Sequence, residues 1–241
     1  MKTHSYSAPI CITLSGDDVT AFGRPALMIS IKKYVVVTPT DIEVEPDSVI
    51  DEVYADVCKE VYGKAQKKLR RVMVHTPYDS SLRAVQAALI VCFSAYLLAQ
   101  KTENKPSESD IQRIAYAVER KRFQQFSHAQ TVCCIQGGLI YYRKEFEFYK
   151  TTVKLPMKLP MGFLSKLEIT APKNSKGKLA EFSAKALTDS EKLTKRLVFA
   201  ISQERKAEWI ESLLQNKNTS DLCFSSGKES FEESLRGLTQ V

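Results

Sequence analysis

The sequence lacks the features that mark several common classes of protein. None of its six cysteines lies in a CxxC pair, and it has no zinc-finger spacing, RNA-binding signature or long run of basic residues. Its longest apolar stretch, Ala84–Ala99, is interrupted by polar side chains and does not reach membrane-spanning length. The N-terminal segment has no apolar signal core that ends in small residues. We therefore expect a soluble, cytoplasmic protein that does not associate with membranes.

The cysteines indicate a reducing compartment. They lie inside apolar segments, at Cys11, Cys58, Cys92, Cys133, Cys134 and Cys223. Buried single thiols are typical of intracellular proteins, whereas disulfide frameworks are typical of secreted ones. The adjacent pair Cys133–Cys134 would point to opposite faces of a strand, which disfavours a shared metal ion. The sequence therefore predicts neither disulfides nor a cysteine metal site.

Composition and charge leave the class of partner open. The chain has 241 residues, of which 44% are hydrophobic and 26% charged, as in an ordinary globular protein. This length suits one large domain or two small ones. The formal net charge of +7 permits weak attraction to nucleic acid, anionic lipid or phosphorylated small molecules, and it specifies none of them.

The hydrophobic pattern predicts an α+β fold. Short β-branched runs predict strands at 10–14, 26–40, 70–76 and 166–172, and the segment 131–155 is expected to form two more strands around Gly137–Gly138. Apolar residues at helical spacing predict helices from a cap at Asp47 or Ser48 to about residue 69, from about 80 to 100, at 111–125 and at 190–215. A weak domain boundary is expected near Pro156–Gly162.

The stretch "SAPICITLSGDDVTAFGRPALMISI" resembles the opening of mevalonate kinases in the GHMP kinase superfamily. The residues that fit the family pattern at the same spacing are Ala8, Pro9, Gly16, Gly23, Pro25, Ala26 and Leu27. The resemblance implies the GHMP kinase fold. Its N-terminal domain, residues 1–160, would resemble ribosomal protein S5 domain 2, and a shortened α/β C-terminal domain would occupy residues 161–241.

A second stretch, "TPYDSSLRAVQAAL", falls where this family has a glycine-rich phosphate loop at a helix N-terminus. Such a loop works because glycine lets backbone N–H groups approach the phosphates. The family's serine pair is kept as Ser80 and Ser81, but other positions of the loop have changed, to His75, Pro77, Asp79, Leu82 and Arg83. Proline removes a donor, and a carboxylate competes with phosphate for the helix end. We therefore expect Asp79 or Ser80 to act as a simple helix cap.

The third stretch, "AVERKRFQQFSHAQTVCCIQGG", matches the family's metal and catalytic segment only in part. Glu119 occupies the position of a metal-ligating glutamate, and three more positions fit, at Ser127, Gly137 and Gly138. The position of the catalytic aspartate is Gln130, which cannot take a proton from a hydroxyl. The first motif also departs from the family, with Cys11 for its lysine and Asp17 and Asp18 for its glutamate and histidine.

These departures predict a protein that has lost phosphotransfer. Losing a general base commonly costs about 10²–10⁴-fold in rate, and here the base, the lysine and the glycine loop have changed together. The family's third glycine-rich motif has no counterpart. We therefore expect a binding or regulatory module without an assigned cofactor, which acts beside an active kinase paralogue or as a homodimer and has room for a small-molecule ligand.

The alternative is an active, divergent ATP-dependent kinase of a small alcohol such as mevalonate. The nucleotide would then be bound by Asp79, Ser80, Ser81 and Arg83, and the Mg²⁺ ion by Ser80 and Glu119. Charges lost from the site would be replaced by Arg83, Lys144 or His128, although a lone histidine is more often a packing residue. A nucleic-acid-binding module is a third hypothesis. The positive charge favours it, but no aromatic–basic interleaving supports it.

Overall fold

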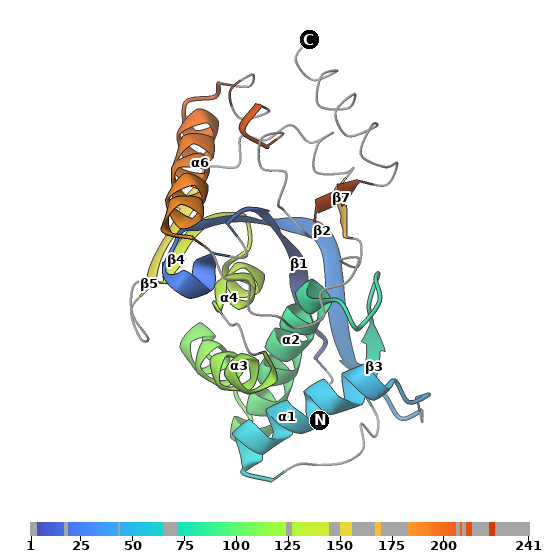
Figure 1. Cartoon of the computed structure of the whole chain (residues 1–241). Coiled ribbons are helices and arrows are strands. Elements are labelled where there is room, and N and C mark those ends of the chain that lie inside the picture. Colours follow the sequence, from blue (N-terminus) through green and yellow to red (C-terminus); the bar gives the residue numbers. More distant parts are fainter. Residues whose placement is uncertain are drawn as a thin grey trace. The chain divides into compact units, whose positions relative to one another are not determined.

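The computed structural model describes residues 4–16, 19–42, 44–64, 72–123, 127–144, 150–155, 167–169, 183–205, 208, 211–213 and 222–224. The chain, drawn in Figure 1, is divided into two compact units whose segments alternate along the sequence. Unit 1 comprises Met1–Cys11 and Lys32–Gly137, and unit 2 comprises Ile12–Ile31 and Gly138–Val241. Strands β1 (Tyr6–Ser15) and β2 (Ala26–Pro39) therefore contribute residues to both units. The predicted boundary near Pro156–Gly162 lies outside the described residues and stays a prediction.

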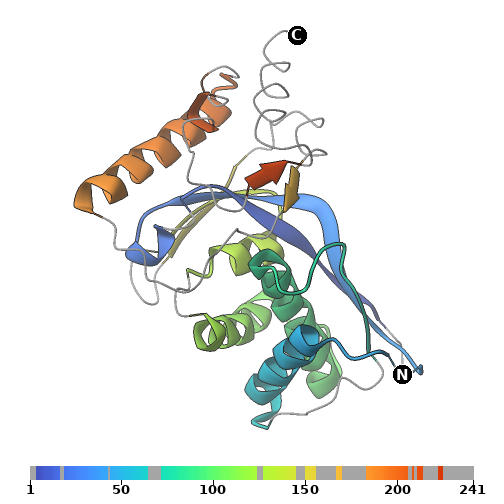
Figure 2. The same cartoon turned by 45° about the vertical axis from the view of Figure 1, so that its right-hand side comes forward.

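Unit 1 is a cluster of helices beside three strand segments. Its helices are α1 (Ser48–Tyr62), α2 (Arg83–Thr102), α3 (Glu108–Arg122) and α4 (Ala129–Gln136), and the first, third and fourth all pack against α2. Figures 1 and 2 show them gathered around this green helix. Strand β3 (Val72–His75) runs antiparallel to the end of β2, with Met73 opposite Thr38. These elements confirm the predicted α+β class.

Helix α2 is the core of unit 1. It is apolar on every side, which is typical of a helix surrounded by protein. By length and composition it could cross a membrane, but 78% of its most apolar window is buried inside the structure. Its buried side chains include Phe93, which meets Tyr54 of α1 edge-on with ring centroids 5.3 Å apart. The apolar composition of α2 is thus explained by its place in the core of unit 1. The cytoplasmic location stays a prediction.

The helix ends follow local side-chain chemistry. Asp47 caps α1, and its Oδ1 accepts the backbone N–H groups of Val49 at 2.9 Å and Ile50 at 3.1 Å. The helix stops at Tyr62 rather than near residue 69, because Gly63 adopts a left-handed conformation with φ 74°. Helix α3 begins three residues earlier than expected, because Ser107 caps it.

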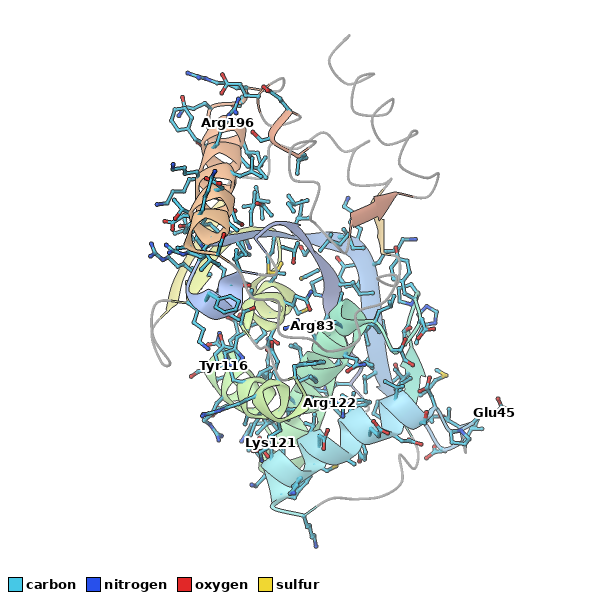
Figure 3. All side chains as sticks on the ribbon, in the orientation of Figure 1. Glu45, Arg83, Tyr116, Lys121, Arg122 and Arg196 are labelled. Atoms are coloured by element: carbon cyan, nitrogen blue, oxygen red, sulfur yellow. The ribbon has the colours of Figure 1, made fainter. Side chains whose placement is uncertain are left out.

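Ion pairs attach the C-terminal end of α3 to α1. Arg122 bonds to Asp56 and lies 3.6 Å from Glu52, and Lys121 bonds to Glu60. Figure 3 shows both basic side chains directed toward α1. They place the last turn of α3, and with it Glu119, at a fixed position within unit 1.

Helix α4 corrects the sequence prediction, which placed a strand from Thr131 onward. Residues 129–136 are helical instead, and β4 (Leu139–Lys144) begins only after Gly138. The helix starts because His128 adopts a left-handed conformation with φ 62°, and its carbonyl accepts the N–H of Val132 at 2.9 Å. A short apolar run fits a buried helix as well as a strand, so its pattern alone does not decide.

Unit 2 is built on antiparallel strands. Residues Ala26–Ile29 of β2 pair with β4, which pairs with β5 (Lys150–Leu155). Along the described strands the sheet order is β1-β2-β4-β5, with β3 beside β2, and a separate pair joins β6 (Leu167–Ile169) to β7 (Leu222–Phe224). Gly16, with φ 84°, permits the turn after β1, since a Cβ there would lie 2.2 Å from the carbonyl oxygen of Pro25.

Helix α6 (Ala184–Ser202), orange in Figure 2, is linked by side chains to β1 and to the segment that precedes β2. Ser183 caps it, so it starts earlier than the predicted residue 190. Ser15 and Thr194 share a hydrogen bond of 2.7 Å, and Arg24 forms an ion pair of 2.6 Å with Glu191. The helix ends at Ser202, before the predicted residue 215.

Candidate functional site

The segment before α2 does not cap the helix with a side chain. The N-cap residue is Leu82, which is extended and makes no side-chain cap hydrogen bond. Asp79 lies in the preceding turn, where its Oδ1 accepts the N–H of Ser81 at 2.8 Å and its carbonyl accepts the N–H of Leu82 at 3.2 Å. The prediction that Asp79 or Ser80 caps this helix is therefore wrong, because both side chains bond elsewhere.

Ser80 joins the starts of two helices. Its hydroxyl donates to Asp47, with Oγ 3.0 Å from Oδ2 and 3.3 Å from Oδ1. Asp47 is the residue that caps α1, so one carboxylate serves both helix starts. Because its proton is donated to Asp47, the Ser80 hydroxyl could donate to a phosphate only by breaking this hydrogen bond.

Asp79 keeps a negative charge in front of α2. Its side chain is exposed, and hydrogen bonds from the side chain and backbone of Ser81 lower the pKa of its carboxyl. A carboxylate is stable near the positive end of a helix dipole. For the same reason it repels a phosphate from that position.

Arg83 is the first residue of α2, and it points toward the end of α3 (Figure 3). Its guanidinium carbon lies 5.1 Å from the ring centroid of Phe123, a distance typical of a cation–π contact. Its positive charge also stabilises the ionised carboxyl of Glu119. The structure thus brings together two of the predicted site residues, Arg83 and Glu119.

Glu119 is buried, with 3% of its surface exposed, and both of its carboxylate oxygens bond to the protein. Oε1 accepts the backbone N–H of His128 at 3.2 Å. Oε2 accepts the hydroxyl of Thr131 at 2.7 Å and lies 3.1 Å from the Nδ1 atom of His128. A buried charge requires such partners, because an unpaired one costs several kcal/mol.

The pKa of Glu119 follows from these contacts. Burial alone would raise it, but the hydrogen bonds from His128 and Thr131, together with the charge of Arg83, bring the pKa below its usual value. The side chain is therefore a carboxylate at neutral pH. It binds the N-terminal end of α4 to α3.

His128 is a packing residue in this cluster. Its ring stacks on Tyr116 of α3, with centroids 3.9 Å apart and an interplanar angle of 18°. Only 8% of its surface is exposed. Tyr116 and Thr131 are members of the site that the sequence reasoning missed, because the family pattern contains no counterpart for either.

Gln130 lies beside this cluster on α4 and has 4% of its surface exposed. Neither its amide nitrogen nor its amide oxygen has a hydrogen-bond partner in the described part of the chain. Leaving a buried polar group unpaired costs about 1–3 kcal/mol. Such a group commonly has a catalytic role, stores strain, or bonds to an ordered water molecule or an ion.

Cys11, at the position of the family's lysine, is fully buried beside two thiols of α4. Burial raises the pKa of the Cys11 thiol, and hydrogen bonding to Cys133 and Cys134 raises it further. The group is therefore neutral at physiological pH. It cannot supply the positive charge that a lysine would place there.

The predicted metal ligands, Ser80 and Glu119, are both engaged by protein groups. Within the described ranges, no group of three or more His, Cys, Asp or Glu side chains is placed to hold a metal ion. Asp17 and Asp18 lie outside the described residues. Lys144, proposed as a replacement charge, belongs to unit 2, so its place relative to this cluster stays a prediction.

Solved structures of several small-molecule kinases have the same fold. A mevalonate kinase matches 98% of this chain and 96% of its own length, with a TM-score of 0.64 and 11% identity. A D-glycero-D-manno-heptose 1-phosphate kinase from Bacteriodes thetaiotaomicron matches 98% and 92%, with a TM-score of 0.62 and 14% identity. The phosphomevalonate kinase of Streptococcus pneumoniae matches 90% and 78%, with a TM-score of 0.59 and 13% identity.

At this identity the likeness concerns the fold alone. No protein-family model matches the sequence, and a comparison with curated protein sequences gives no match. The fold resemblance inferred from the three sequence stretches is confirmed, as is the α+β class.

Proposed function

We propose that this chain, which has the GHMP kinase fold, acts as a binding or regulatory module that has lost phosphotransfer. One observation carries the proposal. Both oxygens of Glu119, the residue at the family's metal position, are occupied by His128 and Thr131 of the same chain. A metal ion would have to compete with hydrogen bonds that each contribute about 1.5–3 kcal/mol to a charged group.

The replacement of the catalytic base points the same way. An amide such as that of Gln130 does not accept a proton from an alcohol at neutral pH. A missing general base commonly lowers the rate about 10²–10⁴-fold. The neutral thiol of Cys11 and the occupied hydroxyl of Ser80 supply no substitute.

A ligand-binding role is supported by the unpaired amide of Gln130. The group offers one acceptor and two donor hydrogens from a buried position. A ligand that carries an amide-like or carboxyl group would satisfy both sides of it. The identity of such a ligand, the homodimer and the kinase paralogue all stay predictions, and nucleic acid stays an untested third hypothesis.

An active kinase of a small alcohol such as mevalonate is the second candidate. One observation favours it: Leu82, the N-cap residue of α2, makes no side-chain cap hydrogen bond. Helix starts of this kind bind phosphate readily. Such an enzyme would use Mg²⁺ and ATP, with Ser81 and Arg83 near the phosphates.

Thermal unfolding with nucleotide separates the two candidates. A ligand that binds the native state at one hundred times its Kd stabilises it by about 2.7 kcal/mol. We expect Mg²⁺ with ATP at millimolar concentration to raise the Tm no more than ATP without the metal. We also expect no ADP release when mevalonate is added.

The variant Glu119→Gln provides the control. If Glu119 has only a structural role, the variant lowers the Tm with and without Mg–ATP by the same amount. A Mg²⁺-dependent stabilisation that disappears in Glu119→Gln, or turnover of mevalonate by the purified protein, would contradict the proposal.

A further inference from the structure

We propose that a cavity in unit 1, apart from the Glu119 cluster, binds a small neutral molecule with an apolar body. The cavity has a volume of about 200 Å³. Its floor is formed by side chains of α2 and α4, namely Val91, Cys92, Ala95 and Cys134. This site does not depend on the function proposed for the Glu119 cluster.

The floor is the apolar part of the cavity, and its small side chains leave the space that a ligand would fill. All four floor side chains are buried, and none of them carries a charge. Ala95 and the two thiols are small, whereas neighbouring positions of α2 carry larger groups such as Phe93 and Leu97. Thiols are soft and polarisable, so they favour contact with aryl and alkyl groups.

The side chains at the mouth of the cavity, its rim, disfavour a charged ligand. Lys105 and Glu108 both line the cavity, and both are exposed at its mouth. Their charges are opposite, so neither an anion nor a cation gains a net attraction. Ser7, also on the rim, offers a hydroxyl to one polar group of a neutral ligand.

The size of the cavity sets the size of the ligand. An engineered protein cavity of about 150 Å³ lined by apolar side chains binds benzene. At about 200 Å³ the present cavity has room for a benzene ring with a short substituent. Benzyl alcohol has this size, is neutral, and carries one hydroxyl for the rim.

The cavity lies on different turns of α2 and α3 from the Glu119 cluster, and on α4 its lining residue Cys134 follows Thr131 by three positions. On α3, Glu108 precedes Glu119 by eleven positions, which is about 16 Å at the rise of an α-helix. On α2, Val91 follows Arg83 by eight positions, or about 12 Å. A ligand in the cavity therefore contacts different turns of α2 and α3 from those that hold the cluster.

Protection of the floor thiols from alkylation tests the proposal. Burial raises the pKa of the Cys92 thiol, so its reaction with iodoacetamide is followed over hours at mildly alkaline pH by mass spectrometry. Benzyl alcohol at ten times its Kd should slow alkylation of Cys92 and Cys134 about tenfold, because only the unoccupied fraction reacts. Cys58 on α1 is equally buried and does not line the cavity, so its rate should not change.

Charged analogues and two opposite variants complete the test. Benzoate and benzylamine should protect the same thiols less than benzyl alcohol does. Ala95→Leu fills the floor and should abolish protection, whereas Cys92→Ala enlarges it and should preserve protection of Cys134. If Ala95→Leu does not fold, wild type and Cys92→Ala, each compared with the Cys58 reference, still show whether benzyl alcohol protects the floor thiols. Equal protection of Cys58, or no protection of either floor thiol, would overturn the proposal.

Discussion

Replacing Thr131 by valine should destabilise the protein, because the change removes a donor from a buried carboxylate. The hydroxyl of Thr131 lies 2.7 Å from Oε2 of Glu119, and neither side chain reaches solvent. A hydrogen bond to a charged group contributes about 1.5–3 kcal/mol. The contacts from His128 remain in the variant, so we expect the free energy of unfolding to fall by about 2 kcal/mol. For a chain of this length that corresponds to a Tm lower by about 4–8 °C.

Thr13 gives a matched control for this substitution. It is as buried as Thr131, but its hydroxyl has no hydrogen-bond partner in the described part of the chain. Valine has nearly the same shape, so Thr13→Val removes an unpaired hydroxyl and should leave the stability unchanged or higher. Urea unfolding of both variants, followed by circular dichroism, measures the difference.

A double-mutant cycle with Glu119→Gln then isolates the contact. The coupling between positions 119 and 131 should be at least about 1 kcal/mol, as is usual for groups in one hydrogen-bond network. If Thr131→Val and Thr13→Val changed the stability equally, the reasoning would be refuted. Glu119 would then be held too weakly to oppose a metal ion.

Three further predictions concern other parts of the chain. The pKa of Glu119 is lowered on folding, so its ionised form contributes stability that is complete above about pH 4.5. This contribution is lost as the pH falls through the lowered pKa. Between pH 7 and pH 3, the urea midpoint should therefore fall less for Glu119→Gln than for wild type. Gln130→Met removes two unpaired amide atoms and should raise the free energy of unfolding of the unligated protein by about 1 kcal/mol, and a loss of stability on urea unfolding would mean that the amide has a partner. Gly16→Ala should lower the Tm more than Gly63→Ala, because both residues have positive φ but only Gly16 would place a Cβ 2.2 Å from a backbone oxygen; equal losses would contradict this account.

The parts of the fold that depend on neighbouring residues could be predicted from the sequence. Asp47 or Ser48 is predicted to cap α1, and Asp47 does so by accepting N–H groups two and three positions ahead. The strands near residues 10, 30 and 140 follow from β-branched runs in the same way. The start of α2 could not be predicted, because the bond from Ser80 to Asp47 joins residues 33 positions apart.

The Glu119 cluster shows the same limit. The family resemblance identified the glutamate, but it gave no sign that Thr131 and His128 occupy its oxygens. Those contacts require that residues 129–136 form a helix and that His128 adopts a left-handed conformation. A positive φ is uncommon in residues other than glycine, so the sequence did not mark His128 as the start of a helix. The side chains of Glu119, His128 and Thr131 come together only because this segment is a helix and not a strand.

The interleaved units affect how the chain can fold during synthesis. All of unit 1 has been made once Gly137 leaves the ribosome, whereas the segment Ile12–Ile31 of unit 2 still lacks most of its partners. Residues Ala26–Ile29 of β2 can pair fully with β4 only after Tyr142 has been synthesised. Until then they present an open strand edge, a common starting point for aggregation. A nascent chain stalled after Gly137 is therefore expected to be less soluble than one stalled after Leu155, which sedimentation of the two truncated chains would measure.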